Sequence, residues 1–199
     1  SRAALERVLE IARRHDLLVV SDEIYDKLLY DGTAHTATAS LADDVPIVTV
    51  NGLSKAYLAC GWRVGWLVLC HGAKGSEYAR AVQRLTDARL CAPAPPQHTI
   101  APALDGPHDH VVEMMGRLRE RRDIMVRRVR GIEGLSVVEP RGAFYAMVRV
   151  DRHAFATDEE LVLRLLHDEG VLFVHGSGFG EKPGTQHFRV VFLPEPDVL

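Results

Sequence analysis

The chain has 199 residues, of which 47% are hydrophobic and 26% charged, and its formal net charge is -3 at pH 7. This composition is typical of soluble globular proteins, and the length suffices for one domain or two small ones. A net charge this small and negative offers no basic surface for nucleic acid, and no apolar run reaches the roughly 18 residues of a membrane span. We therefore expect neither nucleic-acid binding nor a transmembrane segment.

The cysteines and the ends of the sequence add two expectations. Cys60, Cys70 and Cys91 are odd in number and lack C-x-x-C spacing, which indicates neither a disulfide framework nor a metal site and favours a reducing cytoplasm. The sequence begins at Ser1, without a signal peptide, directly in the pattern of an amphipathic helix. It stops at residues 194–199, P-E-P-D-V-L, where Pro and Asp predict the start of a further helix. We therefore expect part of a longer protein.

Extended and helical patterns alternate in the first half of the chain. Continuous apolar runs at residues 17–20 and 47–50 are typical of strands buried on both faces of a parallel sheet, and residues 64–69 form a third predicted strand. The first run leads to Asp22 and the second to Lys55, and α/β sheets place ligand groups at such strand ends. The alternation predicts an open, mostly parallel α/β sheet with helices.

A candidate domain boundary follows this region. A helix is predicted over residues 77–89, then a proline-rich joint at 93–96 and another short helix. The D-G-P string at 105–107 is the best boundary, because Gly and Pro end elements and permit a change of direction. We therefore expect a large domain over residues 1–106 and a smaller one over residues 107–199.

A long helix is predicted just beyond the boundary, over residues 111–130. Seven arginines between Arg117 and Arg130 could form a nucleic-acid patch or a solvated helix face. The apolar residues among them share one face, which favours the solvated face; they are Leu118, Met125, Val126 and Val129.

The remaining patterns predict a smaller α+β domain. Residues 142–150 alternate as expected for a half-covered antiparallel strand, and residues 171–174 and 187–192 form two more predicted strands. Thr157 with Glu160 forms a capping box, which opens a helix that runs to about residue 169.

Lys55 is the residue most suited to chemistry. It lies between a Gly-Leu-Ser turn and a largely apolar run, with no acidic residue near it in sequence. An amine buried away from carboxylates has a lowered pKa and reacts as a nucleophile near pH 7. Eight residues later, Arg63 supplies a permanent planar cation suited to a phosphate. The alternative is a surface Lys and Arg that flank a turn.

Two blocks of sequence resemble a known family. Residues 52–55, G-L-S-K, with residues 61–65, G-W-R-V-G, resemble the pyridoxal-phosphate attachment signature of class I/II aminotransferases. Residues 21–31, S-D-E-I-Y-D-K-L-L-Y-D, resemble the D-E-x-Y block of the same enzymes. The sequences of these blocks, together with R-L-C-A at residues 89–92, are most similar to those of bacterial glutamate–pyruvate (alanine) aminotransferases. The similarity covers the whole sequence, and it implies the C-terminal half of a fold-type I enzyme.

The resemblance implies a role for each motif residue. Asp22 would keep the proton on the cofactor's pyridine nitrogen, and Tyr25 would hydrogen-bond its phenolic oxygen. Lys55 would hold the cofactor covalently and then move a proton between substrate and cofactor. Arg63 would bind the phosphate, with Ser54 sharing that task. The alternatives are Asp22 as a helix N-cap with Tyr25 in the core, and Ser54 as a turn residue.

Two further arginines are candidates for substrate binding. The family places the arginine that binds the substrate α-carboxylate in the strand that contains Arg189. Arg89 resembles, in its offset from Lys55, the arginine that in aspartate aminotransferases reaches across a dimer to the substrate's distal carboxylate. The alternatives are an edge-strand Arg189 that faces solvent and an Arg89 that faces the dipole at a helix end.

The implied reaction moves an amino group between alanine or glutamate and a 2-oxo acid, pyruvate or 2-oxoglutarate, in a homodimer. Other readings are a β-lyase or decarboxylase of the same fold, and the aminotransferase-like sensor domain of a transcription regulator. The family's ring-stacking residue, glycine-rich phosphate loop and ring-facing asparagine would all precede this sequence. We therefore expect the 199-residue chain alone to be inactive or weakly active.

Overall fold

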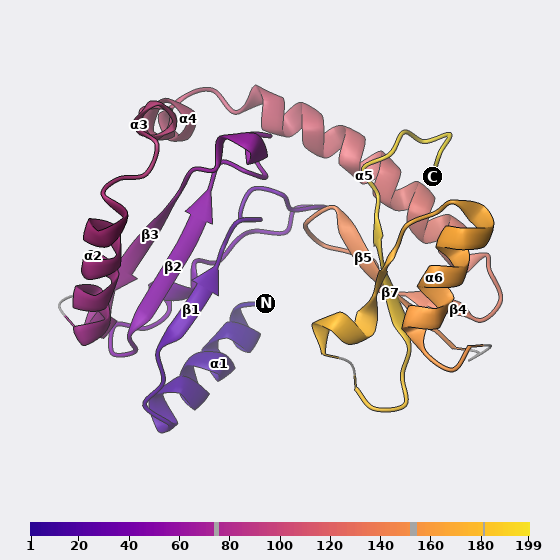
Figure 1. Cartoon of the computed structure of the whole chain (residues 1–199), viewed down its shortest axis with the longest axis horizontal. Helices are drawn as coiled ribbons and strands as arrows, with labels where there is room; N and C mark the ends of the chain where they lie inside the picture. The colour runs from indigo at the N-terminus through magenta and orange to yellow at the C-terminus, as the bar shows by residue number, and fades with distance from the viewer. Residues whose placement is uncertain (74–75, 152–154, 181) are drawn as a thin grey trace. The chain divides into compact units, whose positions relative to one another are not determined.

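The computed structural model describes residues 1–73, 76–151, 155–180 and 182–199. The chain divides into two compact units, and we describe each by itself (Figure 1). The first unit contains residues 1–29 and 34–111, and the second contains residues 30–33 and 112–199. The domain limits at residues 106 and 107 stay a prediction, because compactness alone does not show which part folds independently.

The first unit holds three strands and several helices. Its elements, in chain order, are α1 (Arg2–Arg14), β1 (Val19–Asp22), η1 (Thr38–Ser40), β2 (Ile47–Gly52), η2 (Cys60–Trp62), β3 (Gly65–Cys70), η3 (His71–Ala73), α2 (Glu77–Arg89), α3 (Ala94–Gln97) and α4 (Ile100–Asp105). The long helix α5 (Asp109–Arg130) begins in this unit and continues into the second. The predicted helix over residues 77–89 is therefore confirmed.

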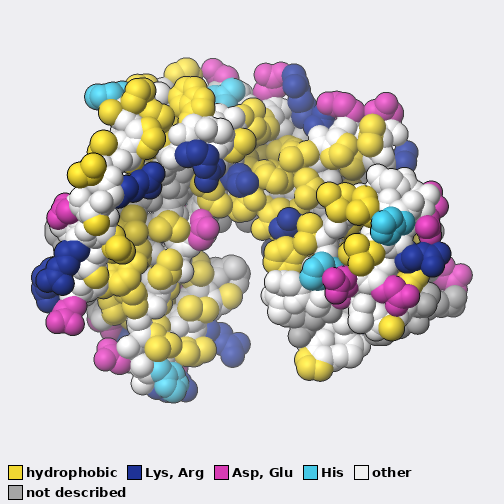
Figure 2. All heavy atoms as spheres, in the orientation of Figure 1, with side chains coloured by type: hydrophobic (Ala, Val, Ile, Leu, Met, Phe, Trp, Pro, Cys, Tyr) yellow, Lys and Arg dark blue, Asp and Glu magenta, His cyan; other side chains and the backbone are white. Residues whose placement is uncertain are grey.

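The sheet of the first unit has the order β1-β2-β3 and is mixed. β1 pairs with β2 in parallel, whereas β2 pairs with β3 antiparallel. The predicted, mostly parallel pattern is thus wrong for the pair β2 and β3. The prediction of strands buried on both faces is also wrong for β1, because Val20 is 60% exposed and Leu17, before the strand, is 49% exposed. Hydrophobic side chains are visible at the surface over the strands of this unit in Figure 2.

A small apolar core joins α1 to the sheet. Leu9 and Ala12 of α1 are almost completely buried against Val45 and Ile47. Burial of one such aliphatic side chain stabilises a fold by roughly 1.5–3 kcal/mol. β1 and β2 lie side by side in the parallel ladder above this core, and both strands end where the candidate residues begin.

The second unit is a two-layer α+β arrangement. Its strands have the order β4-β5-β7-β6 and are antiparallel throughout. The elements after α5 are β4 (Leu135–Val137), β5 (Tyr145–Val150), α6 (Asp158–Glu169), β6 (Val174–His175), η4 (Gly176–Phe179) and β7 (His187–Val191). The strand predicted at residues 171–174 is wrong except at Val174. The strand predicted over residues 142–150 is confirmed from Tyr145 to Val150, and the one over residues 187–192 from His187 to Val191.

One face of this sheet forms the core. Val148 of β5 and Phe188 of β7 are buried with Val126 of α5 and Val162 of α6. Strand residues alternate between faces, so Arg149 of β5 lies on the opposite face, which does not form the core. The other side chains of that opposite face are Tyr145, Met147, His187 and Arg189.

Of the two hydrogen bonds in the capping box predicted for α6, the one from the backbone to Thr157 is present. Thr157 Oγ1 accepts a hydrogen bond from the Glu160 N–H at 3.1 Å, and Gly170 ends the helix with φ 68°. Glu160 Oε2 accepts from the N–H of Ala156, one residue before the cap, at 3.0 Å. The predicted helix to about residue 169 is confirmed.

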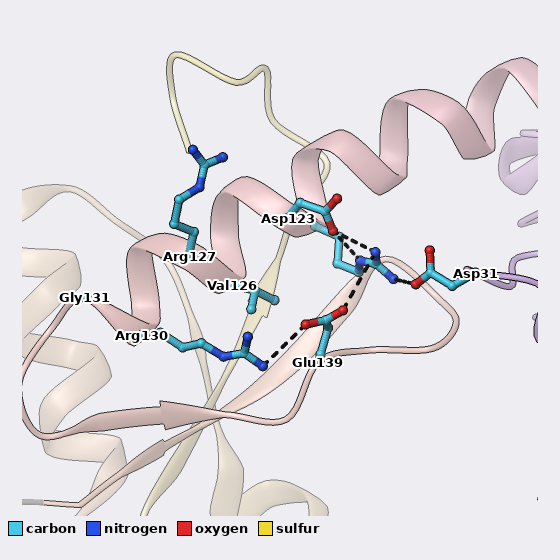
Figure 3. A pocket seen from close by; sticks show the side chains of 8 residues that line it. Asp31, Asp123, Val126, Arg127, Arg130, Gly131 and Glu139 are labelled. Carbon is cyan, nitrogen blue, oxygen red and sulfur yellow. Dashed lines mark hydrogen bonds and ion pairs between the residues drawn. The ribbon is translucent and has the colours of Figure 1, made fainter.

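The solvated arginine face of α5 is confirmed for most of its residues and wrong for Arg122. The Arg122 side chain is 3% exposed, and its Nη1 donates to Asp31 at 2.5 Å while Nε donates to Asp123 at 2.8 Å (Figure 3). Its guanidinium also lies 4.6 Å from the ring centroid of Tyr30. A buried charge needs such partners, because unpaired it costs several kcal/mol. Arg122 thereby fixes residues 30–33 to the second unit.

Candidate active site

The candidate site of the first unit is built on a close approach of two glycines. Gly52 pairs with Gly65 at the end of the β2–β3 ladder. A Cβ on Gly65 would lie 2.6 Å from the Asn51 carbonyl oxygen, and a Cβ on Gly52 would lie 2.9 Å from the Val64 oxygen. These separations are too short for any side chain. The glycines of the sequence signature therefore let two backbones meet at this point.

We expect Gly65→Ala to destabilise the protein. The new methyl group would push β3 away from Asn51, and overpacking of this kind costs about 1–3 kcal/mol. Urea unfolding of the full-length protein measures the loss. The matched control is Gly61→Ala, because a Cβ there has nothing within 4 Å. Equal unfolding free energies for the two variants would contradict the proposed close packing.

A pocket of about 280 Å³ lies beside the paired glycines. Three of the predicted site residues line it: Asp22 from the end of β1, Ser54 from the turn after β2, and Arg63 from the segment before β3. The strand ends bring them together, since β1 and β2 are parallel neighbours. The pocket thus offers a carboxylate, a hydroxyl and a guanidinium to one ligand.

Asp22 is exposed, whereas the resemblance implies a buried carboxylate opposite the ring nitrogen. Its Oδ1 accepts a hydrogen bond from the Ile24 N–H at 3.1 Å, which closes a turn immediately after β1. The alternative of a helix N-cap is wrong, because residues 24–27 form turns and no helix starts there in the described chain. The carboxylate therefore has room for a further partner.

Arg63 has a backbone conformation that presents its side chain at the pocket. Its φ of 53° lies in the left-handed region, which is uncommon for a residue other than glycine. The guanidinium is exposed, and Nη1 donates to the Cys60 carbonyl oxygen at 2.7 Å. A strained residue of this kind is a frequent feature of functional sites.

Lys55 lies in a turn that two buried neighbours anchor. Leu53 is 1% exposed and Ala56 is 2% exposed, and the Leu58 N–H donates to the Lys55 carbonyl oxygen at 3.3 Å. The Lys55 side chain is half-buried, so the burial expected of a reactive amine is only partial. Its Nζ lies 5.9 Å from the ring centroid of Tyr25. The structure thus brings the predicted lysine and tyrosine together.

Glu23, between Asp22 and Tyr25, is a buried charged residue that the sequence reasoning missed. Its side chain is 8% exposed. Burial alone raises the pKa of Glu23, but hydrogen bonds from Thr38, His35 and Ser21 outweigh it, so the pKa lies below the ordinary value. The charge of Glu23 therefore adds stability above the ordinary pKa of about 4.3, and this is lost as pH falls through the lowered value.

Arg189 lies in the second unit, on the face of β7 opposite the core. Its guanidinium carbon is 4.9 Å from the ring centroid of Phe179 and 5.5 Å from that of Tyr145. Among the described residues, its buried Nε has no hydrogen-bond partner. A buried donor without a partner costs about 1–3 kcal/mol, which a ligand oxygen would recover. The alternative of a solvent-facing edge residue is wrong, because β7 lies between β5 and β6.

Arg89 is exposed in the last turn of α2. A cation there interacts favourably with the helix dipole, as in the alternative reading. It does not line the pocket that contains Asp22 and Arg63. Its substrate role stays a prediction.

The sequence matches the family "Aminotransferase class I and II" over residues 1–198. The chain belongs to this family. It is 44% identical to the glutamate-pyruvate aminotransferase AlaA of Haemophilus influenzae over 202 aligned residues, with 98% of this chain and 49% of the relative covered. It is 43% identical to the alanine aminotransferase of Mycobacterium tuberculosis over 197 residues, with 96% and 45% covered.

Solved structures of aminotransferases show the same fold. An alanine aminotransferase from Pyrococcus furiosus superimposes with a TM-score of 0.93 at 44% identity, covering 100% of this chain and 50% of that one. An aminotransferase from Escherichia coli gives 0.93 at 41% identity, covering 99% and 50%. The predicted family and α/β fold class are confirmed. The chain spans about half the length of the curated relatives it matches.

The residues of the first unit fit pyridoxal phosphate, on which this family of enzymes depends. Arg63 offers an exposed planar cation for a phosphate, and Asp22 offers a carboxylate for a protonated ring nitrogen in the same pocket. None of the helices in the described ranges has the length and apolarity to cross a membrane. Within those ranges, no group of three or more His, Cys, Asp or Glu side chains could hold a metal ion.

Proposed function

We propose that the protein is a pyridoxal-phosphate-dependent aminotransferase that acts on alanine and glutamate with pyruvate and 2-oxoglutarate as oxo acids. One observation carries this proposal. The strand ends bring Asp22, Ser54 and Arg63 to one pocket, and Lys55 lies beside Tyr25 in the same unit. Similarity to alanine aminotransferases at 43–44% identity supports the choice of substrates.

The cofactor would withdraw electrons from the bond to the substrate Cα when it is bound. Arg63 would hold its phosphate with two parallel hydrogen bonds, and the Ser54 hydroxyl would donate a third. Asp22 would keep a proton on the ring nitrogen through a charge-assisted hydrogen bond. Tyr25 would donate its phenolic proton to the ring oxygen, and Lys55 Nζ would take and return the substrate proton.

Arg189 would bind the substrate α-carboxylate. Its Nε is already removed from water and lacks a partner among the described residues, so a carboxylate oxygen would satisfy it. Phe179 and Tyr145 lie within 5.5 Å of the guanidinium, which limits the planes that it can adopt. Arg89 would read the distal carboxylate of glutamate. A homodimer and a cytoplasmic location complete the proposal for the whole protein.

The test is a product assay on the full-length protein with added pyridoxal phosphate. We expect amino transfer from alanine to 2-oxoglutarate, with pyruvate and glutamate formed in equal amounts. A β-lyase or decarboxylase would form product without an oxo acid, and a sensor domain would bind the cofactor without turnover. Either of those results would contradict the proposal. The 199-residue chain, assayed alongside, should show little or no activity.

A further inference from the structure

We propose that Glu23 is a positioning residue of the candidate site, whose carboxylate holds the turn that presents Asp22 and Tyr25. This inference rests on the proposed function for what those two residues bind. Glu23 itself points away from the pocket residues and touches no candidate ligand group, because its carboxylate faces the segment before and within η1.

Three donors converge on the Glu23 carboxylate. Oε1 accepts from the Thr38 N–H at 2.9 Å and from the Ser21 hydroxyl at 3.0 Å. Oε2 lies 2.9 Å from Nε2 of His35. Ser21 and Thr38 are themselves 2.8 Å apart through their hydroxyls. The carboxylate therefore joins the end of β1 to residues 35–38, which are distant in sequence.

The main chain of Glu23 is held as firmly as its side chain. Its N–H donates to the Val50 carbonyl oxygen at 2.9 Å, which extends the β1–β2 pairing by one residue. Its carbonyl oxygen accepts from the Asp26 N–H at 3.0 Å. Asp22 precedes Glu23 and Tyr25 follows two residues later, so the positions of both depend on the conformation at Glu23.

The charge of Glu23 is needed to fix the turn after β1. An apolar side chain could fill the space, but it would leave the buried Thr38 N–H without its acceptor, and unmade buried hydrogen bonds are costly. Hydrogen bonds to an ionised acceptor are roughly twice as strong as neutral ones. Glutamine keeps one acceptor oxygen for the Thr38 and Ser21 donors, whereas alanine keeps none.

The experiment compares Glu23→Ala and Glu23→Gln with Glu10→Gln in the full-length protein. Glu10 lies on α1 with a side chain 63% exposed and paired to Arg14, so it is the matched control for loss of a paired carboxylate. Two quantities are measured: the dissociation constant of pyridoxal phosphate, and hydrogen–deuterium exchange of residues 23–28. The second does not need the cofactor.

We expect graded effects. Glu23→Ala should weaken cofactor binding by about 10- to 100-fold, because loss of charged hydrogen bonds frees the turn, and Glu23→Gln should weaken it less. The amides of Asp26 and Leu28, which bond to Glu23 and Tyr25, should exchange faster in the alanine variant. Glu10→Gln should change neither quantity by more than about twofold.

Distinct results identify which proposal fails. Wild-type protein that does not bind pyridoxal phosphate contradicts the proposed function, and the exchange data then decide alone whether Glu23 holds the turn. Wild-type binding with unchanged affinity in Glu23→Ala overturns the inference about Glu23. If Glu23→Ala does not fold, Ser21→Ala, which keeps the carboxylate and removes one donor, should weaken binding by about threefold. Unchanged affinity in that variant overturns the inference too.

Discussion

Replacement of Lys55 by alanine should abolish amino transfer in the full-length protein. In the proposed mechanism Lys55 moves the proton at the substrate Cα. Loss of a general acid–base of this kind lowers the rate by about 10²–10⁴-fold, and loss of the proposed covalent attachment would add to this. We expect the rate constant of the half-reaction with alanine to fall by at least that factor, as measured in single-turnover assays. Cofactor binding should persist, because Asp22 and Arg63 remain in their pocket.

Covalent attachment at Lys55 is checked by borohydride reduction followed by peptide mapping. We expect the label on the peptide that contains Lys55 and its absence from the Lys55→Ala variant. Lys27 is the matched control, since it is another partly exposed lysine of the first unit, 3.7 Å from Asp26. A label on Lys27, or full activity of Lys55→Ala, would contradict the assignment.

Patterns local in sequence predicted much of the fold. The helices over residues 77–89 and 158–169 follow from apolar periodicity and from the Thr157 cap. Asp22 ends β1 as expected, because the apolar run before it has the length of a strand. Only the structure explains why the signature has glycine at positions 52 and 65, because β2 and β3 approach each other closely there.

Features that depend on distant contacts were not predictable from the sequence. Arg122 stands among the exposed arginines of α5 in sequence, yet it is buried because Asp31 comes to it from 91 residues away. Glu23 was overlooked for a similar reason, since His35 and Thr38 reach it only after folding. The antiparallel β3 and the exposed Val20 also reflect sheet context, which apolar runs alone do not encode.

The substitution Arg189→Ala should lower the activity of the full-length protein on every substrate. In the proposed site, Arg189→Ala would remove the charge-assisted pair with the α-carboxylate, which alanine and glutamate share, and would leave that carboxylate unpaired. Such losses cost about 2–5 kcal/mol, or roughly 30- to 5,000-fold in kcat/KM. Arg189→Lys should recover part of this, because an ammonium keeps the charge without the planar pair of donors. The matched control is Arg149→Ala, on the same sheet face but 58% exposed and paired to Asp151 at 3.1 Å.

Comparison with Arg89→Ala separates α-carboxylate binding from distal carboxylate binding. Arg89 would contact only the second carboxylate, so its loss should lower kcat/KM for glutamate and 2-oxoglutarate and leave alanine and pyruvate unchanged. The measurement is kcat/KM for both half-reactions, read as differences in transition-state stabilisation. Equal losses for alanine and glutamate in Arg89→Ala would make Arg89 structural, as its exposed place in the last turn of α2 permits. If Arg189→Ala lowered kcat/KM for glutamate but not for alanine, Arg189 would bind the distal carboxylate instead, because only glutamate has one.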